Sequence, residues 1–260
     1  LSGGDYVQKP SSTPASDYAG LTVLGNTSDV HVNGLGAVIG GTLNSSTINS
    51  GSGVVFGKAT WNMFNGPAYV GSSSYRNTFN GGTNASLATG TAATARNSTD
   101  FNAVLTNLST QLSLLSSTGS TVTYVYGKAV FNAVPNSNGV AVFNLTAIDT
   151  TVFSKGEFEF KLNGATTVIL NSDETTVNIS ANFLNGCAQS IGAKTLWNFY
   201  KATKVTINNQ FGGSILAPLA TFSNGNNIEG SVFVKTLTQW GEIHLQSFTG
   251  SVPNIIGICQ

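Results

Sequence analysis

The sequence predicts a mostly β protein: a right-handed β-solenoid (β-helix) with one long amphipathic α-helix packed alongside. Short apolar runs of strand length are separated by Gly, Asn or Ser about every 8–12 residues. A single segment has helical periodicity, and only 8% of the 260 residues are charged. In a solenoid each coil buries its inward face against its neighbours, and Asn and Thr satisfy backbone groups at the corners. A β-sandwich is the alternative, but it explains one lone helix between strands less readily.

The N-terminal residues 1–19 are polar and contain two prolines, so we expect an extended segment rather than a core element. From Leu21 onward the strand-length runs begin, with LTVLGN, VHVNGLGAVIGG and SGVVFGKATWNMF as examples. We therefore predict one β-solenoid domain over residues 20–260.

A helix is predicted at about residues 98–117, because apolar residues recur there at helical spacing. The apolar stripe consists of Phe101, Val104, Leu105, Leu108, Leu112 and Leu115. Ser98 or Thr99 can cap its N-terminus, and Gly119 can end it. The opposite face is polar, so we expect the helix to lie with one face against the sheets and one in water.

Strand patterns return after the helix, as in TVTYVYGKAVFNAV, GEFEFKL and GSVFVKTL. A weak internal repeat links the two sides of the helix, because VVFGKATWN at 54–62 resembles YVYGKAVFN at 124–132. We interpret the two copies as equivalent strands in adjacent layers of one stacked sheet.

Composition excludes several partners. A net charge of zero provides no electrostatic attraction for nucleic acid. No apolar run approaches the roughly 20 residues of a membrane span, so we expect no membrane insertion. The two cysteines, Cys187 and Cys259, suggest one disulfide formed in an oxidising compartment, and two buried thiols are the alternative.

Seven Asn-x-Ser/Thr sequons make the chain a candidate glycoprotein, although a chain this rich in Asn, Ser and Thr produces some by chance. The candidate glycosylation sites are Asn26, Asn44, Asn84, Asn97, Asn107, Asn144 and Asn178.

Catalytic chemistry has little support in the sequence, so we expect a non-enzymatic protein without cofactor or metal. No Gly-x-Ser-x-Gly elbow is present, although a pairing of Cys187 with a histidine is not excluded. Glu157 and Glu159 could lie about 6–7 Å apart on one strand face, within glycosidase range, but a solvated charged stripe is the simpler interpretation. Glu242 and His244 could share a metal, but hydrogen bonds to turn backbone are favoured.

Exposed aromatic side chains are the best candidates for ligand contact, because aromatic rings stack on sugars and apolar patches. The tryptophan candidates are Trp61, Trp197 and Trp240, and Trp240 is the one most expected to be exposed. Tyr69 and Tyr75 lie in the segment PAYVGSSSYRN. We predict ligand contacts by Trp240, Tyr69 and Tyr75.

The stretch 211–253, FGGSILAPLATFSNGNNIEGSVFVKTLTQWGEIHLQSFTGSVP, carries a recognisable pattern. It resembles the C-terminal signature of the choice-of-anchor A family of surface adhesin domains. Residues that match the signature are Gly212, Gly213, Leu216, Ala217, Pro218, Gly230, Gly241, Glu242, His244, Phe248, Gly250 and Pro253, with Glu229 beside them. The segment GLTVLGNTSDVHVNGLGAVIGGTL is similar to the family's opening.

The resemblance implies a non-enzymatic domain of bacterial or fungal surface proteins, some of them collagen-binding, and a more distant likeness to ice-binding β-solenoids. We therefore expect an adhesin head, monomeric and displayed at the cell surface through wall-anchoring regions outside this chain. Its ligand would be a surface protein, cuticle or polysaccharide. Ice binding is the first alternative, although no Thr-x-Thr ladder emerges from the sequence. A polysaccharide-active β-helix enzyme is the second.

Overall fold

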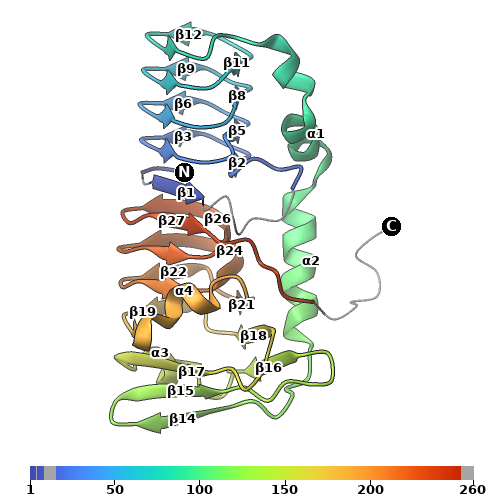
Figure 1. Cartoon of the computed structure of the whole chain (residues 1–260), viewed down its shortest axis with the longest axis vertical. Helices are drawn as coiled ribbons and strands as arrows, with labels where there is room; N and C mark the ends of the chain where they lie inside the picture. Colours follow the sequence, from blue (N-terminus) through green and yellow to red (C-terminus); the bar gives the residue numbers. More distant parts are fainter. Residues whose placement is uncertain (4, 9–15, 253–260) are drawn as a thin grey trace. The chain divides into compact units, whose positions relative to one another are not determined.

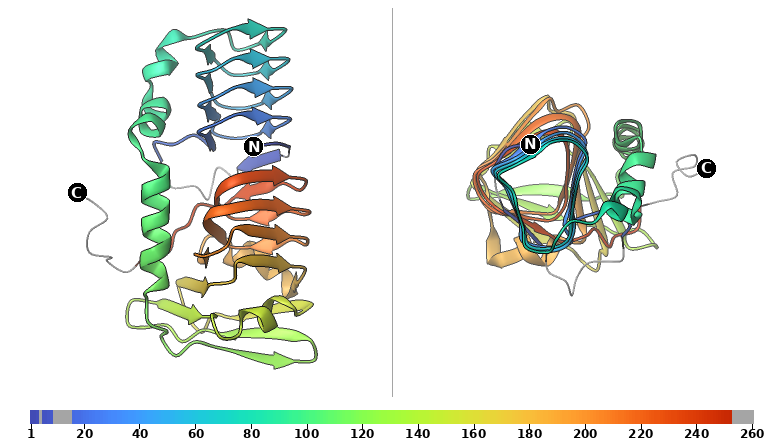
Figure 2. Two further views of the ribbon diagram at one scale, coloured as in Figure 1. Left: turned by 180° about the vertical axis from the view of Figure 1, so that it is seen from behind. Right: turned by 90° about the horizontal axis from the view of Figure 1, so that it is seen from above.

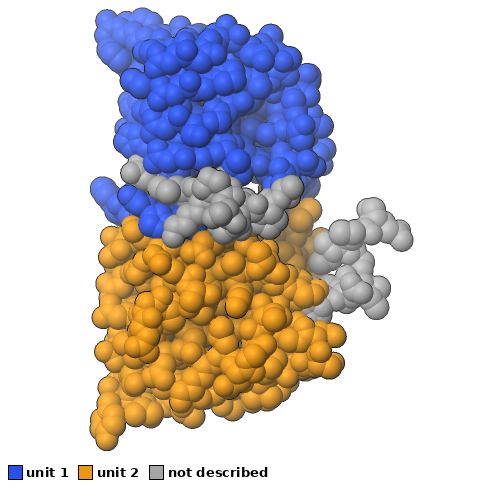
Figure 3. All heavy atoms as spheres, in the orientation of Figure 1, with its two compact units in different colours: residues 1–100, 238–245 blue, residues 101–237, 246–260 orange. Residues whose placement is uncertain are grey.

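The computed structural model describes residues 1–3, 5–8 and 16–252 of the chain. These residues form two compact units (Figure 3). Unit 1 consists of Leu1–Asp100 with Thr238–Leu245, and unit 2 of Phe101–Leu237 with Gln246–Gln260. Both units are mostly β with few helices, as predicted, and their sheets are largely parallel (Figure 1). The prediction of one domain over residues 20–260 stays a prediction.

Three parallel sheets form unit 1. The first sheet contains β2 (Leu21–Val23), β5 (Ala37–Ile39), β8 (Gly53–Val55) and β11 (Ala68–Val70). The second sheet contains β3 (Thr27–Ser28), β6 (Leu43–Asn44), β9 (Ala59–Thr60) and β12 (Ser74–Tyr75). The third sheet includes β1 (Asp5–Gln8), β4 (His31–Val32), β7 (Thr47–Ile48), β10 (Met63–Phe64), β13 (Thr78–Phe79) and β27 (Ile243–Leu245).

Between Leu21 and Phe79, which the structure describes in full, the chain visits the three sheets in turn and repeats this circuit. We call each circuit a rung. Equivalent residues of successive rungs pair in register, as Leu21 does with Ala37 and Ala37 with Gly53. A rung therefore takes 15 or 16 residues, and seen end-on the circuits trace a three-sided outline (Figure 2). Buried side chains such as Val32, Ile48 and Phe64 fill the inside of the rungs.

The N-terminal segment contributes to the core, which corrects part of the sequence prediction. Strand β1 pairs in parallel with both β4 and β27, and Tyr6 is buried. Short length and polar neighbours hid this strand, because its apolar content amounts to Tyr6 and Val7. Residues 9–15 lie outside the described part of the chain.

Two short helices cover the outer face of the first sheet in unit 1. They are η2 (Ala85–Thr89) and α1 (Thr91–Ser98). Ala93 of α1 is buried against Val38 and Val54, which point outward from the first sheet. This contact explains why that sheet face is apolar although it lies outside the rungs.

Unit 2 contains one sheet with strands β14 (Thr121–Val125), β15 (Lys128–Asn132), β17 (Glu157–Lys161) and β20 (Asn182–Phe183). A second contains β16 (Val140–Asn144), β18 (Thr167–Ser172), β21 (Thr195–Phe199), β24 (Ser214–Asn224), β22 (Lys204–Ile207) and β19 (Thr176–Ile179), with β26 (Val232–Gln239) paired to β24. Strand β23 (Phe211–Gly212) pairs with β25 (Ile228–Glu229). The helices are α2 (Phe101–Ser113), α3 (Asp149–Phe153), η3 (Leu184–Gly186) and α4 (Cys187–Ile191).

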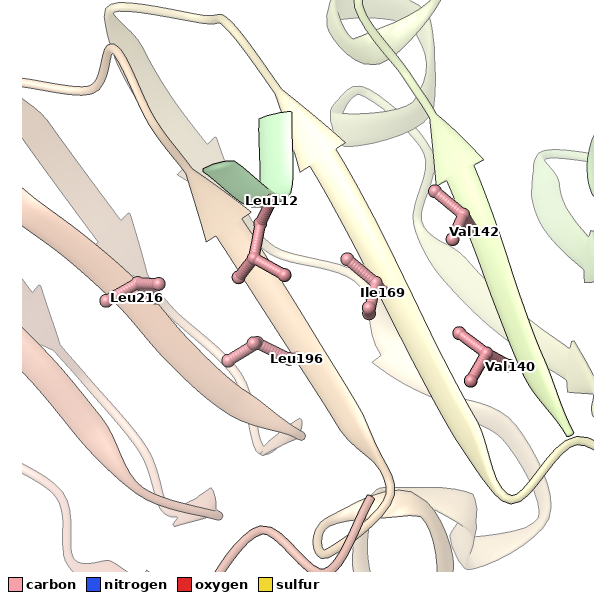
Figure 4. Packing of buried hydrophobic residues seen from close by; sticks show 6 residues of the cluster. All are labelled: Leu112, Val140, Val142, Ile169, Leu196 and Leu216. Atoms are coloured by element: carbon pink, nitrogen blue, oxygen red, sulfur yellow. The ribbon is translucent and has the colours of Figure 1, made fainter. Parts of the chain in front are cut away.

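Helix α2 lies within the predicted range, but the structure does not show one long helix over residues 98–117. Residues 91–98 form the separate helix α1, and Thr99 has extended dihedral angles, φ −99° and ψ 120°, which interrupt the helical path. Leu112 of α2 is buried against strand residues such as Ile169 and Leu196 (Figure 4). Leu105, Leu108 and Leu115 pack against the same cluster, so this part of the predicted stripe does face a sheet.

The interpretation of the internal repeat was wrong. Residues 54–62 run from β8 into β9 along parallel sheets, whereas residues 124–132 lie in an antiparallel hairpin of β14 and β15. At the hairpin turn Tyr126 and Gly127 have φ of 47° and 83°. Positive φ at both turn residues suits a two-residue hairpin, so a similar Gly-Lys-Ala sequence is used here to reverse the chain.

Two buried asparagines attach α2 to the sheet of unit 2. Asn198 Nδ2 donates to the Ser109 carbonyl and to Asn171 Oδ1, each at 2.8 Å, and the Ser109 hydroxyl donates to Asn198 Oδ1 at 2.6 Å. Asn171 Nδ2 in turn donates to the Leu112 carbonyl at 2.7 Å. These hydrogen bonds hold the buried face of α2 at a specific place on the sheet.

Replacing Asn198 by Ala should lower the free energy of unfolding by about 2–4 kcal/mol, because several buried groups lose their partners at once. Asn107→Ala is the matched control, since Asn107 is an exposed asparagine of α2, and it should change stability by less than about 0.5 kcal/mol. Urea unfolding of both variants measures the difference. Equal stabilities would show that the Asn198 network does not hold α2.

The burial of the Tyr6 side chain can be tested through the stability of the protein at alkaline pH. Burial raises the pKa of the Tyr6 phenol above its ordinary value of 10.0, and its hydroxyl has no hydrogen-bond partner among the described residues. The unfolded chain therefore ionises first, so stability should be complete below about pH 10 and fall as the pH rises further. Tyr6→Phe should leave neutral stability equal or higher by about 1 kcal/mol and weaken the alkaline loss. Thermal unfolding across pH 8–11 would refute this if both proteins lost stability equally.

Candidate functional site

The second sheet of unit 1 presents a regular row of side chains to the outside. In β3, β6 and β9 the first residue is buried and the second faces outward, because side chains alternate across a strand. The outward residues pair in register as Ser28–Asn44–Thr60–Tyr75. Ser2 pairs with Ser28 on one side and with Thr238 on the other, which extends the line. We call these six residues the polar row.

The polar row is accessible and evenly spaced. Each of its members is exposed or half-exposed, and neighbouring strands lie about 4.8 Å apart. Four of the six side chains are hydroxyls of Ser or Thr, one is an amide, and one is the Tyr75 phenol. Such an array can donate and accept hydrogen bonds along a periodic surface without any net charge.

A stack of strained residues borders the polar row, at the corner between the second and third sheets. Asp29, Ser45, Trp61 and Arg76 occupy equivalent corner positions in successive rungs, with φ of 59°, 48°, 61° and 53°. We call these four residues the corner stack. Left-handed backbone is unusual for a side chain as bulky as Trp61, and such strain clusters at functional sites.

Aromatic and cationic groups meet at one end of the corner stack. Trp61 is 55% exposed and Tyr75 is 56% exposed, with ring centroids 6.3 Å apart and planes at 88°. The Arg76 guanidinium carbon lies 4.4 Å from the Trp61 ring centroid and 5.1 Å from that of Tyr75. This packing holds the guanidinium in place by cation–π attraction.

The aromatic residues predicted to bind ligand do not all gather at this corner. Tyr75 belongs to the polar row. Trp240 is 80% exposed, as expected, at the turn between β26 and β27. Tyr69 instead packs edge-on against Phe56, near α1 and away from the second sheet. Trp197, the third tryptophan candidate, is fully buried in unit 2. Ligand contact by Trp240, Tyr69 and Tyr75 stays a prediction.

An asparagine ladder runs along the other end of the third sheet's strands from the corner stack, and its amides link successive rungs. Asn33, Asn49, Asn65 and Asn80 donate amide to amide along the third sheet, at 2.6, 3.2 and 2.7 Å. Their sequence separations of 16, 16 and 15 residues equal the rung length. This spacing is the sequence signal for the polar row, and neither the row nor Arg76 was among the predicted site residues.

Glycines of the predicted motif serve close packing in unit 2. A Cβ on Gly212 would lie 2.5 Å from the Ala188 Cα, and one on Gly230 would lie 2.4 Å from the Gly213 carbonyl oxygen. Gly213 has φ of +113°, and Trp197 Nε1 donates to the Gly212 carbonyl at 2.9 Å. Pro218 is buried in β24. Pro253 lies outside the described residues.

The scarce acidic residues of the motif are hydrogen-bonded. Gln246 and Gln210 donate to the buried Glu229 carboxylate at 2.9 and 3.2 Å. In unit 1 His244 Nε2 lies 2.5 Å from Glu242 Oε2, beside Gly241. No group of three His, Cys, Asp or Glu side chains within the described residues is arranged to hold a metal ion.

The glutamates weighed as an acid pair are part of a charged strand face. Lys128 Nζ lies 2.8 Å from Glu159 Oε2, and this hydrogen bond lowers the pKa of Glu159 below its ordinary range. A glycosidase acid requires the opposite shift. Cys187 is half-buried, and burial raises the pKa of its thiol. Cys259 lies outside the described residues, so the predicted disulfide stays a prediction.

All seven sequon asparagines are exposed, as expected for surface positions, although the structure does not test their glycosylation. Asn44 is a member of the polar row, so a glycan there would cover part of that row. Experiments on the row therefore require protein made without glycosylation.

Comparison with known proteins gives the class of the chain. Residues 1–245 match the family described as "Putative Ice-binding-like adhesive domain". The chain belongs to this family of ice-binding-like adhesive domains, which suggests an adhesive role at an external surface. The finer resemblance to choice-of-anchor A domains is not matched. Neither a curated protein nor a solved structure matches the chain significantly.

Membrane insertion has no support from the helices. Within the residues that the structure describes, none is long and apolar enough to cross a bilayer.

Strain in the corner stack can be measured at Ser45, whose hydroxyl makes no hydrogen bond within the described residues and whose φ is +48°. Ser45→Gly should keep stability within about 0.5 kcal/mol, since glycine adopts positive φ freely. Ser45→Val should lower it by about 1–2 kcal/mol, because a branched side chain resists this backbone. Calorimetric melting of the two variants decides, and equal melting temperatures would contradict the strained corner.

Proposed function

We propose that this chain is a β-solenoid adhesive domain that attaches to an extended external surface through the polar row. The observation that carries this proposal is the continuous register from Thr238 through Ser2 and Ser28 to Tyr75. A surface-binding protein needs many weak contacts in a fixed geometry, and parallel rungs supply that geometry. Membership of the adhesive-domain family supports the same function.

Attachment of this kind is expected to be non-enzymatic. Support comes from the Lys128–Glu159 ion pair. It stabilises the charged form of Glu159, one of the two carboxylates considered as a catalytic acid pair. Near-neutral composition further suggests that attachment depends little on ionic strength. Display at a cell surface, and anchoring there through other regions, belong to the same proposal.

Ice binding is the second candidate, because the polar row is periodic and consists mainly of small hydroxyl and amide side chains. Ice presents a repeating hydrogen-bonding surface, which such a row could match. Tyr75 at one end interrupts the small residues, which favours a protein or polysaccharide surface as the first candidate.

The decisive variant places two charges in the row, Asn44→Glu with Thr60→Glu. The matched control, Asn102→Glu with Thr110→Glu, makes the same two changes at exposed positions of α2. Both proteins, made without glycosylation, are tested with the parent chain for retention on collagens, fibronectin, chitin, glucans, cuticle wax, plastic and ice. Desolvating unpaired carboxylates is costly, so the row variant should lose at least about tenfold in retention while the control keeps it.

The identity of the retaining surface separates the two candidates. Saturable retention on a protein or polysaccharide that is lost in the row variant would establish the adhesin, and ice shaping lost in that variant would establish ice binding. Retention that survives the row variant, or no retention on any surface, would overturn the polar row as the adhesive site.

A further inference from the structure

A groove lies on the far side of the corner stack from the polar row. It has a volume of about 360 Å³, within the range of small-molecule sites. Its lining comes from the corner positions and from the neighbouring outward row of the third sheet. The lining residues are Ser45, Ser46, Thr47, Trp61, Asn62, Met63, Arg76 and Thr78.

The polar groups of this groove are of two kinds. Those of its floor, Asn62 and Ser46, are hydrogen-bonded within the protein, whereas the hydroxyls of its wall are not. Asn62 Nδ2 donates to the Leu43 carbonyl and to Asn77 Oδ1, and its Oδ1 accepts from the Ser46 amide. These bonds fix the floor before any ligand arrives.

On the wall, the hydroxyls of Ser45, Thr47 and Thr78 make no hydrogen bond within the described residues. They are therefore available to a ligand that carries hydroxyls of its own.

Arg76 supplies the charge of the groove. Its guanidinium is held over Trp61 and Tyr75, and no carboxylate pairs with it in the described part of the chain. The acidic member of the corner stack, Asp29, lies three rungs away, which is about 14 Å at the spacing of parallel strands. A guanidinium fixed by aromatic rings and lacking an acid partner presents its N–H donors to an incoming carboxylate.

We propose that this groove binds an acidic saccharide, a sugar ring that carries a carboxylate. The ring would contact Met63 and the part of Trp61 that Arg76 leaves uncovered, its hydroxyls would bond to the three free hydroxyls of the wall, and its carboxylate would bind Arg76 in a bidentate manner. Strained backbone at Ser45, Trp61 and Arg76 supports a functional role, because it places these side chains together at a stability cost. The groove lies beside the polar row, and the two share only Tyr75, whose ring packs against Arg76.

The probe is tri-galacturonic acid, and its methyl ester is the matched ligand in which the same rings carry no charge. Calorimetric titration should show that the acid binds at least about tenfold more tightly than the ester. Arg76→Gln should remove this preference and leave ester binding unchanged. Arg76→Lys should restore part of it, because lysine keeps the charge without the bidentate geometry.

Variants at two exposed tryptophans locate the binding. Trp61→Phe should weaken both ligands severalfold, and Trp240→Phe, the matched change at the other exposed tryptophan, should leave both unchanged. Melting temperatures show whether each variant is folded. A polar-row variant that adds no charge, Asn44→Ala with Thr60→Ala, should bind the acid as the parent does, so failure of one site is distinguishable from failure of the other.

Several results would overturn the proposal. Equal binding of acid and ester, or absence of saturable binding by both, would remove the role of Arg76. Binding of a short aspartate-rich peptide as tight as that of the acid would show that the groove recognises carboxylates without a sugar ring. Loss of binding in Trp240→Phe but not in Trp61→Phe would place the site elsewhere.

Discussion

Buried asparagine amides are the constraint on which this structure depends. Parallel rungs with short strands leave backbone groups at every corner, and a buried group without a partner costs more than a hydrogen bond gains. Asn62 closes one such corner in unit 1 by bonding to Ser46, Leu43 and Asn77. In unit 2 Asn171 and Asn198 do the same between strands and α2. The architecture therefore accounts for asparagine at these buried positions, and the outer rows follow from the register that these amides help to set.

Sequence patterns were sufficient for the strand-rich fold and for much of the apolar stripe on α2, because alternation and helical spacing are local properties. They failed where contacts with residues distant in the sequence determine the local structure. Strand β1 is too short to be recognised without its pairing to β4 and β27. The break at Thr99 lies before Phe101, the first residue of the apolar stripe, so the stripe gives no sign of it. The Gly-Lys-Ala repeat was misread because the turn at Tyr126 and Gly127, rather than the repeat itself, reverses the chain.

The candidate site was found only in part, for a related reason. Exposure of Tyr75 and Trp240 could be expected from their polar, turn-rich neighbours, whereas Tyr69 is sequestered by Phe56 through a contact one rung away. The polar row contains one residue per rung, so it has no motif in the sequence and becomes visible once the rung length is known. Asn33, Asn49, Asn65 and Asn80 carry that length in their spacing. Arg76 was not predicted, because its contact with Trp61 is set by the stacking of rungs and leaves no local pattern in the sequence.

The register of the rungs is the central claim, and the distance between two members of the polar row tests it most directly. Nitroxide labels at Asn44 and Tyr75, in a chain whose cysteines are replaced by serine, should lie on the same face two rungs apart. Their backbone separation is then about 10 Å, which gives strong dipolar broadening in the electron paramagnetic resonance spectrum relative to the two single labels. A slip of one residue would turn one label into the core and away from the other. Unbroadened spectra would contradict the register, and with it both the polar row and the groove beside it.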